Sequence, residues 1–110
     1  MIIKKITSKQ DGLNLEIAIM ECKNPKGVVQ FSHGMAEHKE RYFDFMRYLN
    51  DCGYVCVIHD HRGHGSSVKS KNDYGYFYTE NADYIVEDLF QVTEYVREMY
   101  PGLELSLIHI

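Results

Sequence analysis

The sequence predicts an α/β fold, in which helices flank a largely parallel β-sheet. Three patterns indicate this: an N-terminal stretch that alternates apolar and polar residues, two short and almost continuous apolar runs, and two stretches with apolar residues at helical spacing. Of the 110 residues, 45% are hydrophobic and 25% are charged, which is typical of a globular domain. We therefore expect one domain, or part of one.

The N-terminal segment predicts an antiparallel β-hairpin. Apolar and polar residues alternate in 2–8 and in 13–22. The sequence Gln10-Asp11-Gly12 between them is typical of a hairpin turn.

Residues 27–58 predict a strand, a helix and a second strand. The runs Gly27–Ser32 and Tyr54–Ile58 are almost continuously apolar, as in strands that are covered on both faces. Between them, apolar residues at i, i+3, i+4 and i+7 indicate a helix over 40–52, with Gly53 placed to cap its end. This order of elements predicts a right-handed parallel crossover.

The rest of the chain predicts a loop, a second helix and a fifth strand. Residues 60–83 lack a sustained period and form a long loop after a strand, where function is commonly found. Apolar residues spaced by four and three predict a helix over 84–100, with Asn81 as its cap and Pro101-Gly102 as its end. The run 103–110 is typical of a strand. A parallel sheet whose last strand is followed by no further element is incomplete.

Composition excludes several classes of protein. The formal net charge is −4 with acids and bases interleaved, so we expect no nucleic-acid partner. The chain carries no secretory signal and no apolar run of about 18 residues, which predicts no transmembrane segment. Its three cysteines are odd in number and lack C-x-x-C spacing, which argues against a disulfide framework or a zinc site. A cytoplasmic protein is expected.

The first polar segment whose residues suit catalysis or binding is His33-Gly34-Met35-Ala36-Glu37-His38, directly after a predicted strand. Gly34 lets the backbone turn sharply, so that the N–H of Met35 can point into a cleft and stabilise an oxyanion. Ligands bind at the carboxyl ends of strands in open α/β sheets. An ordinary strand-to-helix turn explains the same residues, and spacing alone does not separate the two interpretations.

The second polar segment is Asp60-His61-Arg62-Gly63-His64-Gly65-Ser66-Ser67, after the next strand. Asp60 and Arg62 can pair and tie the loop down, while Gly63 and Gly65 supply the backbone freedom of a tight turn. We interpret the segment as a structural turn whose side chains, His64 among them, need not touch substrate.

A metal site is the alternative for this second segment. His59, His61 and His64 have a spacing similar to that of binuclear zinc hydrolases, but Gly63 stands where those enzymes place a ligand Asp. Successive strand residues also point to opposite faces, so His59 and Asp60 do not enter one cluster without a rearrangement. We therefore expect no metal.

Taken together, the two segments resemble the monoacylglycerol lipase and lysophospholipase branch of the α/β-hydrolases, of the serine aminopeptidase S33 type. The resemblance rests on the H-G-M-A-E-H block, on Arg41-Tyr42, on Asp60–Ser66 and on the turn Tyr100–Leu103, and it extends from about residue 12 to 105. It implies the α/β-hydrolase fold, with the Met35 amide as an oxyanion donor. It also implies a set of residues that bind substrate or shape the loop and the acyl entrance: His33, Gly34, Glu37, His38 and Arg41.

The catalytic residues of that family are missing from this sequence. Family members carry a Gly-x-Ser-x-Gly elbow after the strand that begins here near Leu103, then an acidic residue and a histidine. This chain contains no such elbow. Ser66 and Ser67 follow Gly65, but they do not lie in a strand-turn-helix elbow, so we expect neither to be a nucleophile. We therefore expect the chain to be the N-terminal part of a serine hydrolase and to be inactive by itself.

Residues 105–110 (L-S-L-I-H-I) are expected to be a non-native tail. The same hexapeptide is encoded by one reading frame of a common transposon-end sequencing adapter. A natural strand rich in Leu and Ile is the alternative. Residues 1–104 are then the N-terminal part of an α/β-hydrolase domain.

The resemblance implies a carboxylic-ester hydrolase that acts on a lipid such as a monoacylglycerol or lysophospholipid, by acyl transfer to a serine and without a cofactor. A lid, absent from this chain, would provide any peripheral membrane contact. The alternative is a non-catalytic binding module that uses the cleft without chemistry.

Overall fold

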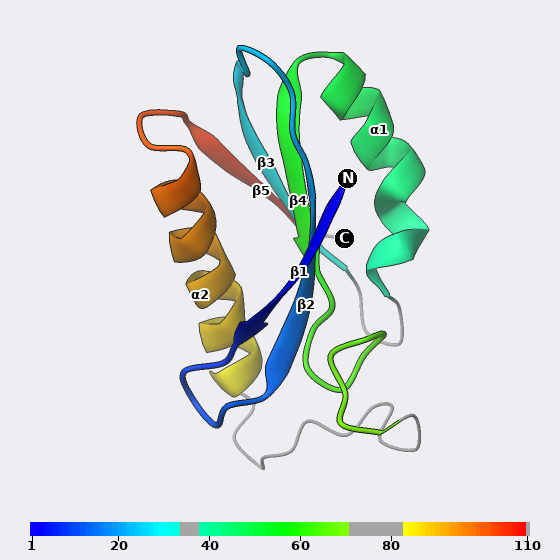
Figure 1. The fold of residues 1–110 in the computed structure, drawn as a ribbon, viewed down its shortest axis with the longest axis vertical. Coiled ribbons are helices and arrows are strands. Elements are labelled where there is room, and N and C mark those ends of the chain that lie inside the picture. The colour runs from blue at the N-terminus through cyan, green and yellow to red at the C-terminus, as the bar shows by residue number, and fades with distance from the viewer. Residues whose placement is uncertain (34–37, 71–82, 110) are drawn as a thin grey trace.

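A computed structural model of the chain describes residues 1–33, 38–70 and 83–109, which form a five-stranded mixed sheet between two helices (Figure 1). The strands and helices, in chain order, are β1 (Ile2–Thr7), β2 (Asn14–Met20), β3 (Gly27–Ser32), a 3-10 turn η1 (Lys39–Tyr42), α1 (Phe43–Asp51), β4 (Tyr54–His59), α2 (Asp83–Met99) and β5 (Leu105–His109).

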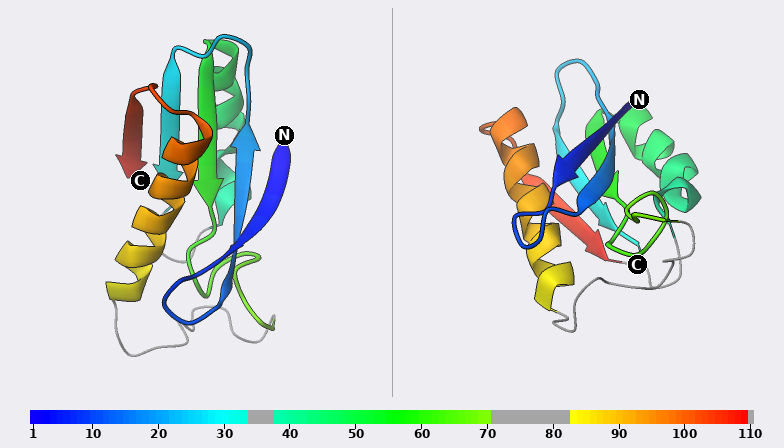
Figure 2. Two further views of the ribbon diagram at one scale, coloured as in Figure 1. Left: turned by 60° about the vertical axis from the view of Figure 1, so that its left-hand side comes forward. Right: turned by 60° about the horizontal axis from the view of Figure 1, so that its bottom comes forward.

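The strand order is β1-β2-β4-β3-β5. β3 pairs in parallel with both β4 and β5, whereas β2 pairs antiparallel with β1 and with β4. The register places Phe31 opposite Ile58, and Ser32 opposite His109. The carboxyl ends of β3, β4 and β5 therefore lie at the same end of the sheet, where the loop that follows β4 also lies (Figure 2).

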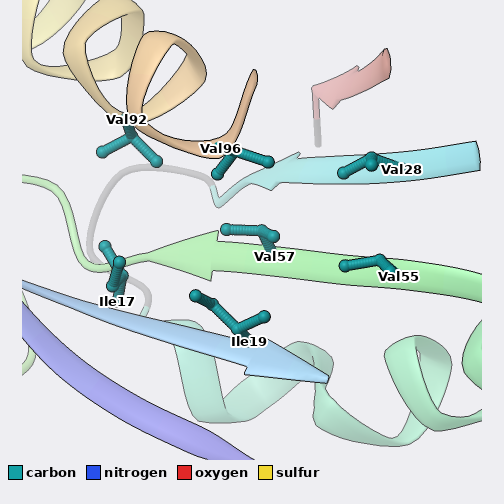
Figure 3. Close-up of a cluster of buried hydrophobic side chains, with 7 residues drawn as sticks. All are labelled: Ile17, Ile19, Val28, Val55, Val57, Val92 and Val96. Atoms are coloured by element: carbon teal, nitrogen blue, oxygen red, sulfur yellow. The ribbon is translucent and has the colours of Figure 1, made fainter. Parts of the chain in front are cut away.

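The two helices cover opposite faces of the sheet (Figure 1), and a hydrophobic cluster lies under each. Figure 3 shows the cluster under α2. Val92 and Val96 of α2 pack on side chains from β2, β3 and β4, whereas Met46 of α1 packs on the other face. Full burial of one such side chain stabilises the fold by about 1.5–3 kcal/mol. The buried members of the α2 cluster are Ile17, Ile19, Val28, Val55, Val57, Val92 and Val96.

This arrangement explains why the central strands read as apolar runs. Residues Val55–His59 are all buried because alternate side chains enter the two clusters. β1 lies at an edge of the sheet and carries Lys4 and Lys5, both exposed, as edge strands commonly do. The backbone φ of +78° at Gly12 and of +101° at Gly53 suits the hairpin turn and the end of α1.

The predicted α/β fold is confirmed, with the hairpin, the parallel unit and both helices in their predicted order. The segment predicted as one helix over 40–52 is a 3-10 turn, Lys39–Tyr42, followed by α1, which begins only at Phe43. Residues 105–109, assigned above to a tail, form β5. The predicted cap Asn81 lies outside the described residues. Within the described part of the chain, no helix is long and apolar enough to cross a membrane.

Candidate active site

His33, the first residue of the first polar segment, contacts the second polar segment at the carboxyl ends of β3 and β4. The backbone N–H of His61 donates a hydrogen bond of 2.9 Å to Nε2 of His33, and the two rings lie 4.3 Å apart between centroids. The hydroxyl of Ser32 is 3.0 Å from Nε2 of His61. The end of one strand is thereby joined to the loop that follows its neighbour.

Not every predicted site residue can be placed. Gly34, Met35 and Glu37 lie outside the described residues, so the predicted oxyanion donor stays a prediction. His38 is exposed, and its Nδ1 lies 3.1 Å from Oε1 of Glu40. Arg41 is exposed on η1.

Lys39, which follows the first polar segment directly, is completely buried. Its ammonium group donates hydrogen bonds to three carboxylates, of Glu16 at 2.5 Å, Glu40 at 2.7 Å and Asp60 at 2.8 Å. Burial alone would lower the pKa of Lys39, but these hydrogen bonds, that to Asp60 foremost, raise it above its ordinary value. The ammonium group has three N–H donors, and each of them is matched by one of the three carboxylates.

The carboxylate of Asp60, fully buried at the end of β4, is the centre of this cluster. Oδ1 accepts the backbone N–H of Lys39 at 2.7 Å, and Oδ2 accepts the backbone N–H of Ser66 at 3.0 Å as well as the Lys39 ammonium. One side chain therefore fixes the start of η1 and the turn that follows β4.

Arg62 makes a second buried ionic cluster, and here the expected pairing of Asp60 with Arg62 is wrong. Its Nε donates to Asp88 of α2 at 2.7 Å, and its Nη1 donates to Asp11 of the hairpin turn at 2.7 Å. Its Nη2 also donates to the hydroxyl of Ser8, which itself donates to Asp88 at 2.6 Å. Burial opposes the charge, but the hydrogen bonds to Asp11 and Asp88 raise the pKa of Arg62 above its ordinary range. The guanidinium prefers these two partners because together they occupy its planar fork.

The turn after β4 is built as predicted, from glycines with left-handed backbone. Gly63 has φ +75° and Gly65 has φ +51°, and a Cβ on Gly65 would collide with the Asp60 carboxylate. Ser67 is buried, donates its hydroxyl proton to the carbonyl of Asp60 at 2.7 Å and accepts the N–H of Glu16 at 3.0 Å. The Ser67 hydroxyl is thus engaged both as donor and as acceptor within the fold.

The three histidines of the alternative metal site do not gather their ring nitrogens into a ligand set within the described residues. The described residues bring only Glu16, Glu40 and Asp60 close enough, with one oxygen of each within 4.8 Å of the others. Such oxygens suit a hard cation. The Lys39 ammonium already lies among them and supplies the positive charge.

Sequence reasoning missed the partners of both buried cations. Lys39 sits between two polar residues, and no periodic pattern indicates that it is buried. Asp88 did carry a signal: it lies three residues after Ile85 and four before Val92, on the apolar side of the predicted helix. A lone acid at such a position predicts a buried cation nearby.

Comparison with known proteins bears on both polar segments. The family model described as serine aminopeptidase, S33, matches residues 23–108. A monoglyceride lipase homolog from Monkeypox virus is 32% identical, over 86% of this chain and 35% of its own length. Human monoglyceride lipase is also 32% identical, over 76% of this chain and 26% of its own length.

Solved structures show the same fold. A carboxyl esterase from Bacillus coagulans superposes with a TM-score of 0.86 and 27% identity, over 96% of this chain and 34% of that one. A soluble variant of the monoglyceride lipase from Saccharomyces cerevisiae has a TM-score of 0.80 and 21% identity, over 99% of this chain and 35% of that one. The chain thus covers between about a quarter and a third of the length of these relatives.

Replacing Gly65 by Ala is expected to destabilise the fold by about 3 kcal/mol, because the added Cβ combines a strained φ with displacement of the buried Asp60 carboxylate. Urea unfolding measures the change. Gly12→Ala is the matched control, since its φ is also positive but its Cβ would meet nothing within 4 Å. It should cost about 1 kcal/mol. Equal losses in the two variants would contradict the role given to Asp60.

Replacing Lys39 by Met is expected to destabilise the fold by about 3–5 kcal/mol, because it leaves the buried Asp60 charge without its cation. The double variant Lys39→Met/Asp60→Asn should recover part of the loss, since it removes both charges. Arg47→Met, which breaks the exposed pair with Asp44, should have no measurable effect. An unfolding free energy for Lys39→Met that matches the control would refute the buried ion cluster.

Proposed function

Because the chain belongs to the serine aminopeptidase S33 family of α/β-hydrolases, we propose that it forms the oxyanion-binding part of a serine ester hydrolase that acts on a monoacylglycerol or a lysophospholipid. The observation that carries the proposal is the family match over 23–108, which spans both polar segments. The relatives named monoglyceride lipase support the choice of a glycerol-lipid ester. We also propose a cytoplasmic location.

The proposed reaction is acyl transfer to a serine. A serine hydroxyl attacks the ester carbonyl and gives its proton to a histidine, and the same proton then passes to the departing alcohol as the carbon–oxygen bond breaks. Water releases the acid by the reverse sequence. The N–H of Met35, two residues beyond the buried His33, is the proposed donor to the negatively charged carbonyl oxygen.

The nucleophile in this proposal follows β5. β5 runs parallel to β3 with His109 opposite Ser32, so a residue that continues β5 emerges beside the end of β3. A strand-to-helix elbow there would expose a serine hydroxyl to the same cleft as the Met35 amide. We therefore propose that the natural gene continues past Glu104 into a short apolar strand in the position of β5 and then into Gly-x-Ser-x-Gly. That residues 105–110 are not part of that gene is a separate proposal, which rests on their match to the adapter sequence.

The first test is the role of the Met35 amide in the longer gene product. Met35→Pro removes the N–H and should lower kcat/KM for a monoacylglycerol by 100- to 1,000-fold, equivalent to roughly 3 kcal/mol of transition-state stabilisation. Met35→Ala keeps the N–H and should cost far less. Equal losses would indicate a side-chain role, and a change in KM alone would indicate substrate packing.

The second test reads the source DNA beyond codon 104. We expect an elbow serine there, and we expect a fluorophosphonate probe to label the extended protein but not the 110-residue chain, which contains no Gly-x-Ser-x-Gly. Replacing the elbow serine by Ala is the control and should abolish labelling. A stop codon after Ile110, or serine-dependent labelling lost on mutating Ser66 or Ser67, would sink the proposal.

A further inference from the structure

Four histidines lie buried side by side at the carboxyl ends of β3 and β4. His33, His59, His61 and His64 are 3%, 0%, 6% and 5% exposed. Ring centroids are 4.8 Å apart for His59 and His61, and 5.4 Å apart for His33 and His64. An imidazole in water changes charge near pH 6.5.

His59 is surrounded in a way that disfavours its charged form. It pairs across the sheet with Ile17, a member of the hydrophobic cluster under α2. Neither of its ring nitrogens has a hydrogen-bond partner among the described residues. Burial, followed by the neighbouring His61 and His33, lowers the pKa of His59 well below its ordinary value.

His33 resists protonation for a separate, geometric reason. Its Nε2 accepts the backbone N–H of His61 at 2.9 Å, so this nitrogen carries no proton. A proton placed there would turn the acceptor into a donor and break the hydrogen bond. That bond joins the end of β3 to the loop after β4.

The acidic groups on neighbouring elements already have cations. Asp60, next to His59, and Glu16 of β2 accept from the Lys39 ammonium. Asp88 of α2 accepts from Arg62. Among these described acids, a charge on His59 would therefore gain none that is not already paired with Lys39 or Arg62.

We propose that His33 and His59 form a proton-sensitive brace: neutral, they hold the carboxyl ends of β3 and β4 together, and protonation opens this end of the fold. The brace is a property of the described fold and does not depend on the proposed hydrolase activity. Its trigger is mild acid.

The direction of the pH effect follows from proton binding. Above about pH 6.5 both the folded and the opened chain carry neutral imidazoles, so the brace adds no pH dependence. Below that value the opened chain binds protons that the folded chain cannot, and stability falls with falling pH. Each such histidine lowers the folding equilibrium constant about tenfold between pH 7.5 and 5.5.

The test compares urea unfolding of the 110-residue chain at pH 7.5 and 5.5 with that of two variants. His59→Gln should reduce the acid-induced fall in the folding constant about tenfold, because it removes one proton-binding ring. His38→Gln is the matched control: the His38 side chain is 54% exposed, and its removal should leave the fall unchanged. A fall in His59→Gln equal to that of the unchanged chain would overturn the proposal.

A second measurement keeps the proposal testable if His59→Gln does not fold. Ring resonances of the unchanged chain can be followed by NMR from pH 7.5 to 5.5. The His33 and His59 rings should stay neutral in folded molecules and become charged only in opened ones. A folded molecule with either ring charged at pH 5.5 would refute the brace.

Discussion

The buried carboxylate of Asp60 fixes the geometry on which the rest of the site depends. It receives two backbone amides and one ammonium, and these donors come from segments that the chain brings together only on folding. Taking a charge out of water is costly, and good hydrogen-bond geometry is what offsets that cost. A carboxylate satisfied in this way tolerates little displacement of its donors. It therefore specifies where η1 starts and how the turn after β4 runs.

Arg62 holds the same turn from the other side. While Asp60 reaches toward η1 through Lys39, the Arg62 guanidinium reaches toward α2 and the hairpin turn through Asp88 and Asp11. Asp60 and Arg62 thus attach one loop to η1 on one side and to α2 and the hairpin turn on the other.

How far the sequence predicts this structure depends on the range of the interaction concerned. β4 was predictable because burial on both faces leaves a continuous apolar run, and the glycine turn was predictable because the left-handed backbone of Gly63 and Gly65 is a local requirement. The partner of Arg62 was not predictable from local pattern. Asp88 is 26 residues away along the chain, whereas Asp60 is the nearest acid in sequence. Ion pairing across a fold is decided by which side chains the sheet brings into reach, and no periodicity records that.

The buried polar groups at this end of the sheet fall into two chemical kinds with different consequences. Lys39 and Arg62 are permanent cations, and the hydrogen bonds of their carboxylates raise the pKa of each above its ordinary value. Beside them, His59 fills volume without a charge, because burial lowers its pKa, and His33 supplies a hydrogen-bond acceptor. Since Glu16, Asp60 and Asp88 are already paired with Lys39 and Arg62, an additional proton on the His59 ring would bring an uncompensated charge into the core. The buried charges are thus balanced as long as the imidazole is neutral. In the proposed brace, the ends of β3 and β4 stay together under the same condition.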